Sequence, residues 1–185
     1  MATFFDAISE KQRSFIEAQH VFFVASAPLS AGGHVNVSPK GMDSFRVLGP
    51  NRVAYLDLTG SGNETSAHLN ENGRITVMFC AFEGPPKIVR LFGTGRVVAQ
   101  LDSEWVKLSA LFPTFTGTRQ IMVIEVAQTQ DSCGMSVPCY EFREDRDALV
   151  NHWQKQGQDK VEEYWGRNAK SIDGMDAFPL KPKTP

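Results

Sequence analysis

The sequence has few of the residues from which metal sites and disulfide frameworks are built. It holds 3 cysteines and 4 histidines among 185 residues. Cys80, Cys133 and Cys139 form an odd set that lacks the spacing of zinc ligands. Cys80 lies in an apolar segment, where a cysteine usually behaves as a small buried hydrophobe. We therefore expect no metal site, and reduced thiols of the kind found in the cytoplasm.

An excess of positive charge is also missing. The chain carries 19 Lys and Arg against 21 Asp and Glu, a net charge of −2. Nucleic acid and anionic membrane surfaces are therefore poor partners, and a small molecule is the better one. No segment approaches the roughly 18 apolar residues of a membrane span, and the first residues lack the pattern of an export signal. We expect a cytoplasmic protein.

Internal repeats and interdomain linkers are absent as well. Hydrophobic residues make up 42% of the chain and charged residues 22%, as in an ordinary globular domain. We expect one domain over residues 1–168, flanking helices included, and a C-terminal tail over 169–185. The final residues 181–185 should be mobile.

What is present is a series of short apolar segments separated by turn signals. The expected strands are 21–26, 34–38, 44–48, 52–57, 74–82, 87–98 and 119–126. Gly93 and Gly95 interrupt the long strand, as at a bulge or a barrel corner. Helices are expected over 5–19, from Asp102, and over 144–165, where Gly157 divides an amphipathic segment. Six or seven short strands with few helices predict a mainly β (α+β) barrel.

The most informative segment runs from Leu58 to Leu69, where a glycine-rich turn joins a strand to a short helix. Ser61 and Glu64 have the spacing of a capping box, and Asn63 is the alternative N-cap. Backbone N–H groups at residues 63–65 would then point outward beside hydroxyl groups, which favours a bound phosphate. A plain helix start is the alternative. A Rossmann site is disfavoured, because Thr65 replaces the third glycine and the helix is short for a parallel crossover.

At these residues the chain resembles the pyridoxamine 5′-phosphate oxidase-like flavoproteins. The resemblance covers about residues 20–126. It is carried by the segment 58–79, with Thr59 and the polar cluster that opens the helix, and by the strand 90–97. It implies a six- to seven-stranded antiparallel split β-barrel with flanking helices. It also implies a homodimer with FMN bound at the subunit interface.

The resemblance assigns seven residues to the cofactor by position. They are Val37, Ser38, Lys40, Thr59, Asn63, Thr65 and Ser66. The first three would lie along the flavin ring and phosphate, Thr59 beside the isoalloxazine, and the last three at the phosphate. Lys40 would supply a point charge there, while hydroxyl groups and helix N–H groups complete the shell. A solvated turn lysine is the alternative for Lys40.

The chain departs from true pyridoxamine phosphate oxidases at two places. Those enzymes carry an Arg-Lys pair where Glu64 and Thr65 stand. Their C-terminal segment, with a tryptophan and arginines that hold pyridoxal phosphate, has no counterpart in 171–185. We therefore do not expect vitamin B6 oxidation. The segments 132–138 and 171–174 resemble those of an uncharacterised branch of the family.

No acid–base pair or nucleophile triad stands out, as in proteins whose cofactor carries the chemistry. We expect an FMN-dependent oxidoreductase that transfers hydride between the flavin and a small organic substrate, with NAD(P)H as a candidate donor. The catalytic residues are unknown. Two alternatives stay open: a non-catalytic flavin-binding or sensing protein, and a haem-binding split barrel. For haem the candidate ligands are His20, His34, His68 and His152.

Three other residues have two interpretations each. Asp173 orients a substrate if residues 171–174 fold over the flavin, or lies in a tail packed on the surface. Cys133 is a redox thiol near the flavin or an unreactive loop cysteine. His68, inside the short helix, packs or faces water more often than it acts as an acid or base.

Overall fold

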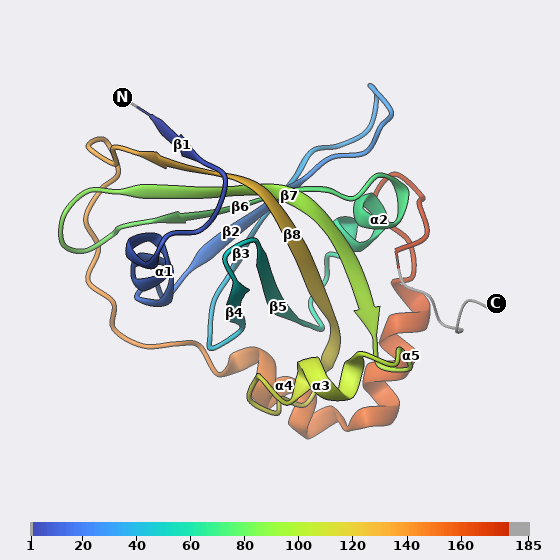
Figure 1. Ribbon diagram of the computed structural model, residues 1–185. Coiled ribbons are helices and arrows are strands. Elements are labelled where there is room, and N and C mark those ends of the chain that lie inside the picture. Colours follow the sequence, from blue (N-terminus) through green and yellow to red (C-terminus); the bar gives the residue numbers. More distant parts are fainter. Residues whose placement is uncertain (1, 178–185) are drawn as a thin grey trace.

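The computed structural model describes residues 2–177, and within them eight strands form one sheet that five helices flank (Figure 1). The strands are β1 (Thr3–Phe5), β2 (Phe22–Ser26), β3 (Asn36–Lys40), β4 (Phe45–Gly49), β5 (Arg52–Leu58), β6 (Arg74–Cys80), β7 (Ile88–Ala99) and β8 (Thr118–Ser132). The helices are α1 (Glu10–Glu17), α2 (Glu64–Glu71), α3 (Trp105–Ser109), α4 (Ala148–Gln156) and α5 (Gln158–Arg167). The predicted mobile end, residues 181–185, lies outside the described residues.

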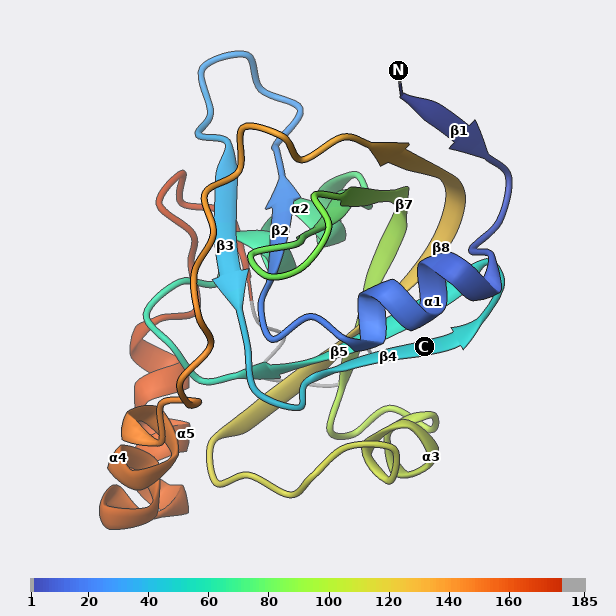
Figure 2. The ribbon, with the colours of Figure 1, turned by 90° about the vertical axis from the view of Figure 1, so that its left-hand side faces the viewer.

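All strand pairs are antiparallel, in the order β3-β2-β6-β7-β8-β5-β4, with β1 added along β8. The sheet curls on itself, and β3 and β4 stand at the two ends of the order (Figure 2). This arrangement confirms the predicted antiparallel split barrel with flanking helices. The strand number is eight rather than six or seven, because β1 was not predicted.

Alternating side chains of the strands fill the interior of the barrel. Fully buried members include Val24, Tyr55, Val77, Leu91 and Ile124, each contributed by a different strand. Burial of each large side chain stabilises the fold by roughly 1.5–3 kcal/mol. A second apolar cluster, which includes Leu108 and Phe112, lies between the sheet and α3. The barrel therefore provides a rigid frame for the turns between its strands.

The two glycines of β7 lie where the prediction of a bulge put them. The register between β7 and β8 shifts between Phe92 and Gly93. A Cβ atom at Gly93 would overlap the carbonyl oxygen of Glu125 on β8, and one at Gly95 would lie 3.0 Å from Leu69 of α2. Backbone and helix thus approach β7 more closely than a side chain permits.

The N-terminal prediction was wrong in two respects. The first helix spans Glu10–Glu17 rather than 5–19, because Ser9 and Gln12 form a capping box that fixes its start. The residues before it form β1, which pairs with Thr129–Asp131. That pairing also extends β8 to Ser132, beyond the predicted end at Val126. Contacts between residues so distant in sequence leave no local pattern.

The C-terminal helices confirm the predicted division at Gly157. This glycine has φ 81°, a left-handed conformation that glycine adopts without strain, and it separates α4 from α5. Trp153, Val161 and Trp165 are the buried residues of the pair. The indole Nε1 groups of both tryptophans donate to Thr59, just after β5. The two helices therefore dock on the glycine-rich turn.

The first part of the tail packs on the barrel domain. Ser171 and Ala177 are buried, and a bridge joins Lys170 to Asp176. The carboxylate of Asp173 accepts hydrogen bonds from the backbone N–H and the ring Nδ1 of His34, in the loop before β3. In this structure, residue 173 thus follows the surface-packing interpretation. The boundary at residue 168 stays a prediction.

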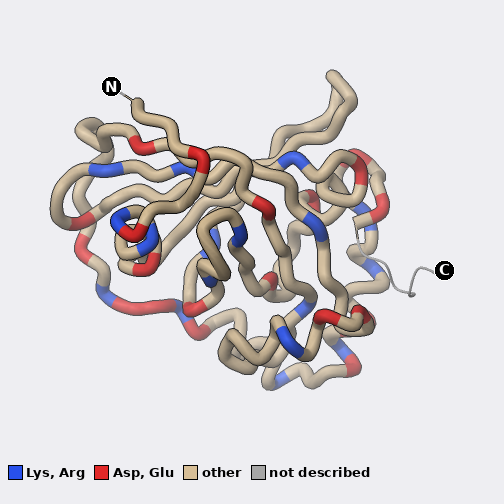
Figure 3. The backbone as a smooth tube through the Cα atoms, viewed as in Figure 1, with Lys and Arg blue, Asp and Glu red and all other residues tan. Residues whose placement is uncertain are grey.

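Charges of both signs are distributed over the traced chain rather than gathered on one element (Figure 3). None of the helices within residues 2–177 has the length and apolar character that a membrane span requires. Within the same residues, no group of three or more His, Cys, Asp or Glu side chains is arranged to hold a metal ion. Cys80 is buried, as predicted, whereas Cys133 and Cys139 are exposed, and all three are free thiols.

Replacing Gly93 with alanine should destabilise the fold by about 1–3 kcal/mol, because the new methyl group has no room beside Glu125. The matched control is Gly166→Ala, in α5, where a Cβ atom meets nothing within 4 Å. That change should stabilise by about 0.5–1 kcal/mol through helix propensity. Urea denaturation measures both, and equal effects would contradict the close approach at the bulge.

Candidate functional site

The turn from β5 into α2 faces strand β3, and contacts of Asn36 and Lys40 with Thr65 and Asp57 join the two. Asn63 is the N-cap of α2, so the structure follows the second of the two predicted helix starts and not the Ser61–Glu64 capping box. The side chain of Asn63 makes no capping bond. Within residues 2–177, no group accepts a hydrogen bond from the backbone N–H of Asn63, Glu64 or Thr65. N–H groups without partners at a helix N-terminus favour an anion there. The predicted outward orientation of these groups stays a prediction.

Behind the turn lies a buried carboxylate, Asp57, at the end of β5. Its side chain is 3% exposed. Oδ1 accepts from Lys40 Nζ at 2.9 Å, and Oδ2 accepts from Arg119 Nε and Gln120 Nε2, each at 2.9 Å. Burial alone would raise the pKa of Asp57, but Arg119 and Lys40 outweigh it and hold that pKa well below its ordinary value. Asp57 is therefore ionised.

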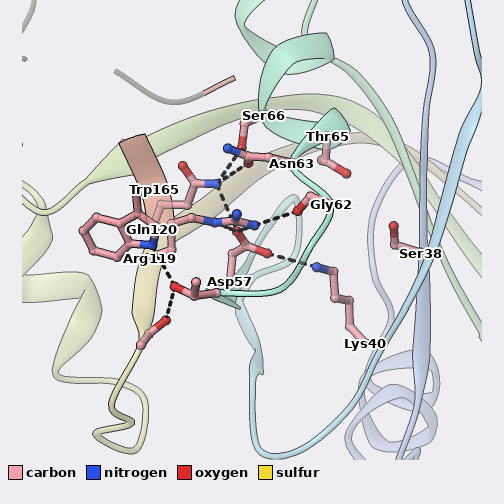
Figure 4. A network of polar contacts seen from close by, with 12 residues as sticks. Ser38, Lys40, Asp57, Gly62, Asn63, Thr65, Ser66, Arg119, Gln120 and Trp165 are labelled. Atoms are coloured by element: carbon pink, nitrogen blue, oxygen red, sulfur yellow. Dashed lines mark hydrogen bonds and ion pairs between the residues drawn. The ribbon is translucent and has the colours of Figure 1, made fainter. Parts of the chain in front are cut away.

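The residues that hold Asp57 also hold the turn (Figure 4). Arg119 Nη2 donates to the carbonyl oxygen of Gly62 at 3.0 Å. Gln120 Nε2 also donates to Asn63 Oδ1 at 3.2 Å and to Ser66 Oγ. Because Asp57 pairs with Gln120 across β5 and β8, the register of the sheet brings this network together.

Sequence reasoning missed Asp57, Arg119 and Gln120. The only available signal was their position, because a charged residue at the end of one apolar strand and polar residues at the start of another are unusual in a core. The same network explains why Asn63 makes no side-chain capping bond, because its side chain is engaged by Ser66 and Gln120 instead of the helix backbone.

Strand β3 forms the opposite side of the site. Asn36, Ser38 and Lys40 alternate along it and share a face, and Asn36 Nδ2 donates to Thr65 Oγ1 at 3.0 Å. Figure 4 shows Ser38 and Lys40 directed toward the turn. Val37 belongs to the other face, and it is 62% exposed. The structure thus brings Ser38, Lys40 and Thr65 together but directs the side chain of Val37 elsewhere.

Thr59 and Ser66 are fully buried, and their hydroxyl groups already have partners. Thr59 Oγ1 donates to the carbonyl oxygen of Gly117 at 2.6 Å and accepts from Trp165 Nε1 at 2.8 Å. Ser66 Oγ donates to Asn63 Oδ1 at 2.6 Å. In this structure Thr59 therefore anchors α4 and α5, and Ser66 supports the N-cap. Their predicted contacts with a cofactor stay predictions.

Within the Lys40–Asp57–Arg119 cluster the charges do not cancel, because two cations face one carboxylate. Glu64, in the first turn of α2, adds a further carboxylate beside Gly62. Arg119 is 3% exposed, whereas Lys40 is 25% exposed. Lys40 can therefore meet a ligand while Arg119 acts from behind. Asn63 Nδ2 is buried without a hydrogen-bond partner among residues 2–177. An unmatched positive charge, an unpaired donor and free helix N–H groups fit a phosphate.

The histidines are dispersed over the described structure. His20 stacks on Phe142, His34 binds Asp173, and His152 lies on α4 beside Trp153. His68 is fully buried, with Nδ1 2.9 Å from Ser26 Oγ, and burial lowers its pKa. This confirms that His68 packs inside the protein.

Replacing Asp57 with asparagine should destabilise the protein by about 3–5 kcal/mol at pH 7, because Arg119 loses its buried counter-charge. Since the pKa of Asp57 is lower in the folded chain than in the unfolded chain, its contribution is present above about pH 5 and is lost toward lower pH. The difference from wild type should therefore shrink below about pH 5.

The matched control is Asp43→Asn, which removes an exposed carboxylate that also pairs with an arginine, Arg46. Asp43→Asn should lower the free energy of unfolding by less than about 1 kcal/mol. Urea denaturation at several pH values measures both variants. An Asp57→Asn effect as small as that of the control would contradict the role assigned to the buried pair.

Comparisons with known proteins agree with this fold. The family model described as pyridoxamine 5′-phosphate oxidase matches residues 8–133. A pyridoxamine 5′-phosphate oxidase family protein of Aspergillus flavus, ustO, is 44% identical over 150 residues, which are 78% of this chain. The chain spans 59% of the length of that relative.

Two solved structures share the fold at low sequence identity. HupZ of Group A Streptococcus aligns with a TM-score of 0.53 at 21% identity, over 68% of this chain and 99% of that one. A candidate pyridoxamine 5′-phosphate oxidase of Lactobacillus delbrueckii aligns with a TM-score of 0.53 at 20% identity, over 68% of this chain and 94% of that one. The family match covers more than half of the sequence. The chain belongs to the pyridoxamine 5′-phosphate oxidase family.

Proposed function

We propose that the protein binds FMN through its phosphate at the turn between β5 and α2 and acts as an oxidoreductase. The observation that carries the proposal is the unmatched positive charge of the Lys40–Asp57–Arg119 cluster beside the free N–H groups of α2. A dianionic phosphate would balance the positive charge and accept hydrogen bonds from the free N–H groups. Membership of a family whose resemblance implies FMN supports the choice of this phosphate ligand.

Each group of the site has a defined task in this proposal. Lys40 Nζ pairs with a phosphate oxygen, and the N–H groups of residues 63–65 donate to the others. Thr65 adds a hydroxyl group, and Ser38, whose Oγ donates to Asn36 Oδ1 at 3.0 Å, adds another when it exchanges that partner for a phosphate oxygen. Arg119 and Gln120 keep the turn in place. When bound, the flavin supplies hydride transfer at N5, and the protein orients it and excludes water.

The substrate is proposed to be a small organic molecule, with NAD(P)H as the electron donor. Glu64 stands where a pyridoxamine phosphate oxidase has a cationic residue, so oxidation of vitamin B6 is not proposed. A homodimer belongs to the same proposal. Val35 and Val37, 71% and 62% exposed, lie on or next to β3 at an end of the sheet, where a second copy would cover them.

The phosphate should account for most of the affinity for FMN. Wild type is expected to prefer FMN over riboflavin by at least about tenfold, because charge-assisted hydrogen bonds are strong. Lys40→Gln should lower that preference by about tenfold while leaving riboflavin affinity similar. Fluorescence titration with FMN and with riboflavin measures both affinities and hence the preference. The matched control is Lys87→Gln, since Lys87 is similarly exposed, pairs with Asp131, and lies far along the sheet. Equal effects of the two changes would contradict a phosphate at Lys40.

Turnover separates an oxidoreductase from a flavin-binding protein. The purified protein should show a flavin absorption spectrum after FMN addition, and NADH or NADPH should bleach it without oxygen. Reoxidation by an added acceptor should restore the spectrum. Binding without bleaching by either donor would favour the non-catalytic alternative, and a haem spectrum would replace the proposal. Light scattering on the same sample tests the homodimer.

A further inference from the structure

A cavity lies on the other side of the glycine-rich turn, between the turn and the two C-terminal helices. Its volume is about 360 Å³, within the range of small-molecule sites. Gly60 and Ser61 form one wall, and α4 and α5 form the other. These helices follow residue 133, where the family match ends, so this cavity depends on a part of the chain outside that match.

Helical spacing creates the wall. Lys160, Tyr164 and Arg167 are four and three residues apart, so they share one face of α5, next to the buried face of Val161 and Trp165. On α4, Leu149 and Trp153 are four residues apart and face the same space. Gly157, with its positive φ, permits the sharp turn between α4 and α5 that places these two helix faces on the same cavity.

The cavity has an apolar interior and a cationic mouth. Trp153 is 5% exposed and lies edge-on to Tyr164, with ring centroids 5.3 Å apart. The side chains of Lys160 and Arg167 are instead 58% and 66% exposed. The residues that line the cavity include no Asp or Glu.

One carboxylate near the mouth must be counted. Glu163 lies 2.6 Å from Lys160 Nζ and 3.7 Å from Arg167 Nη2. It stands between the two cations on the same helix and does not line the cavity. One carboxylate against two cations leaves a net positive charge at the mouth.

We propose that this cavity binds a small organic anion that has a flat, aromatic body. The body packs against Trp153, Tyr164 and Leu149, where ring edges and faces make favourable contacts. The carboxylate or phosphate group lies at Lys160 and Arg167. The assignment of this anion as the substrate rests on the proposed function, because Gly60 and Ser61 belong both to this wall and to the turn beside the proposed flavin phosphate.

The test is a calorimetric titration of the full-length protein, with and without FMN. The probes are benzoate and phenyl phosphate, with benzamide as the neutral match for benzoate. Both anions should bind saturably with Kd below about 1 mM, and benzoate should bind at least about tenfold more tightly than benzamide. Absence of saturable binding by both anions, or equal affinity for benzoate and benzamide, overturns the proposal. The stronger of the two anions indicates which acid group the site prefers.

Variants locate the binding. Lys160→Met with Arg167→Gln should weaken benzoate binding at least about tenfold and leave FMN affinity unchanged. The matched control is Lys155→Gln, which removes a cation of α4 that does not line the cavity. It should leave both affinities unchanged. Thermal unfolding confirms that each variant is folded. Equal benzoate affinity in wild type and the double variant overturns the proposal.

The FMN titration keeps the two proposals separate. Selective benzoate binding in a protein that fails to bind FMN supports the anion site and removes the proposed function. FMN binding without selective benzoate binding removes the anion site alone. Bleaching by NAD(P)H whose rate depends on benzoate concentration supports the assignment of the cavity as the substrate site.

Discussion

The buried carboxylate of Asp57 is the constraint on which the rest of the site depends. A charge so far from water is tolerated only with partners, and it has three, Lys40 from β3 and Arg119 and Gln120 from β8. Asp57 itself is on β5, so the one carboxylate ties three strands to each other. Two of its partners continue to the turn that opens α2. The position of the helix N-terminus is therefore fixed by charge pairing in the core and not by its own capping residues.

In the proposed function, this arrangement is another way to offer positive charge to the FMN phosphate. Where a pyridoxamine phosphate oxidase has cationic residues on the phosphate helix, this chain has Glu64 and Thr65. Positive charge comes instead from β3, through Lys40, and from behind the turn, through Arg119. Side chains held on strands, with buried partners, are positioned more rigidly than exposed side chains on a helix. The same pairing makes Lys40 serve both the fold and the proposed ligand.

The glycine-rich turn lies between two different environments. On one side are β3 and the free N–H groups of α2, within the region that the family model matches. On the other side are α4 and α5, which dock through the two indole groups that bond to Thr59. Thr59 is thus the contact between the shared barrel and the helices that follow it. Thr59, Gly60 and Ser61 are the turn residues that line the cavity between the turn and these helices.

The sequence by itself determined the features that depend on neighbouring residues. Alternating apolar residues and turn signals located seven of the strands, Gly93 marked the bulge, Gly157 marked the break between α4 and α5, and the turn from Leu58 to Leu69 marked the open helix end. Only the tertiary structure decided which polar groups meet. Lys40, Asp57 and Arg119 are separated by many residues. The β5–β8 register brings Arg119 to Asp57, and the curling of the sheet brings Lys40 of β3 to the same carboxylate. The side chain of Asn63 accepts from Gln120, 57 residues away, instead of capping the helix backbone, and β1 exists only through its pairing with β8. Such long-range partners leave no periodicity in the chain, because the energy that selects them is the burial of charge and the completion of the sheet.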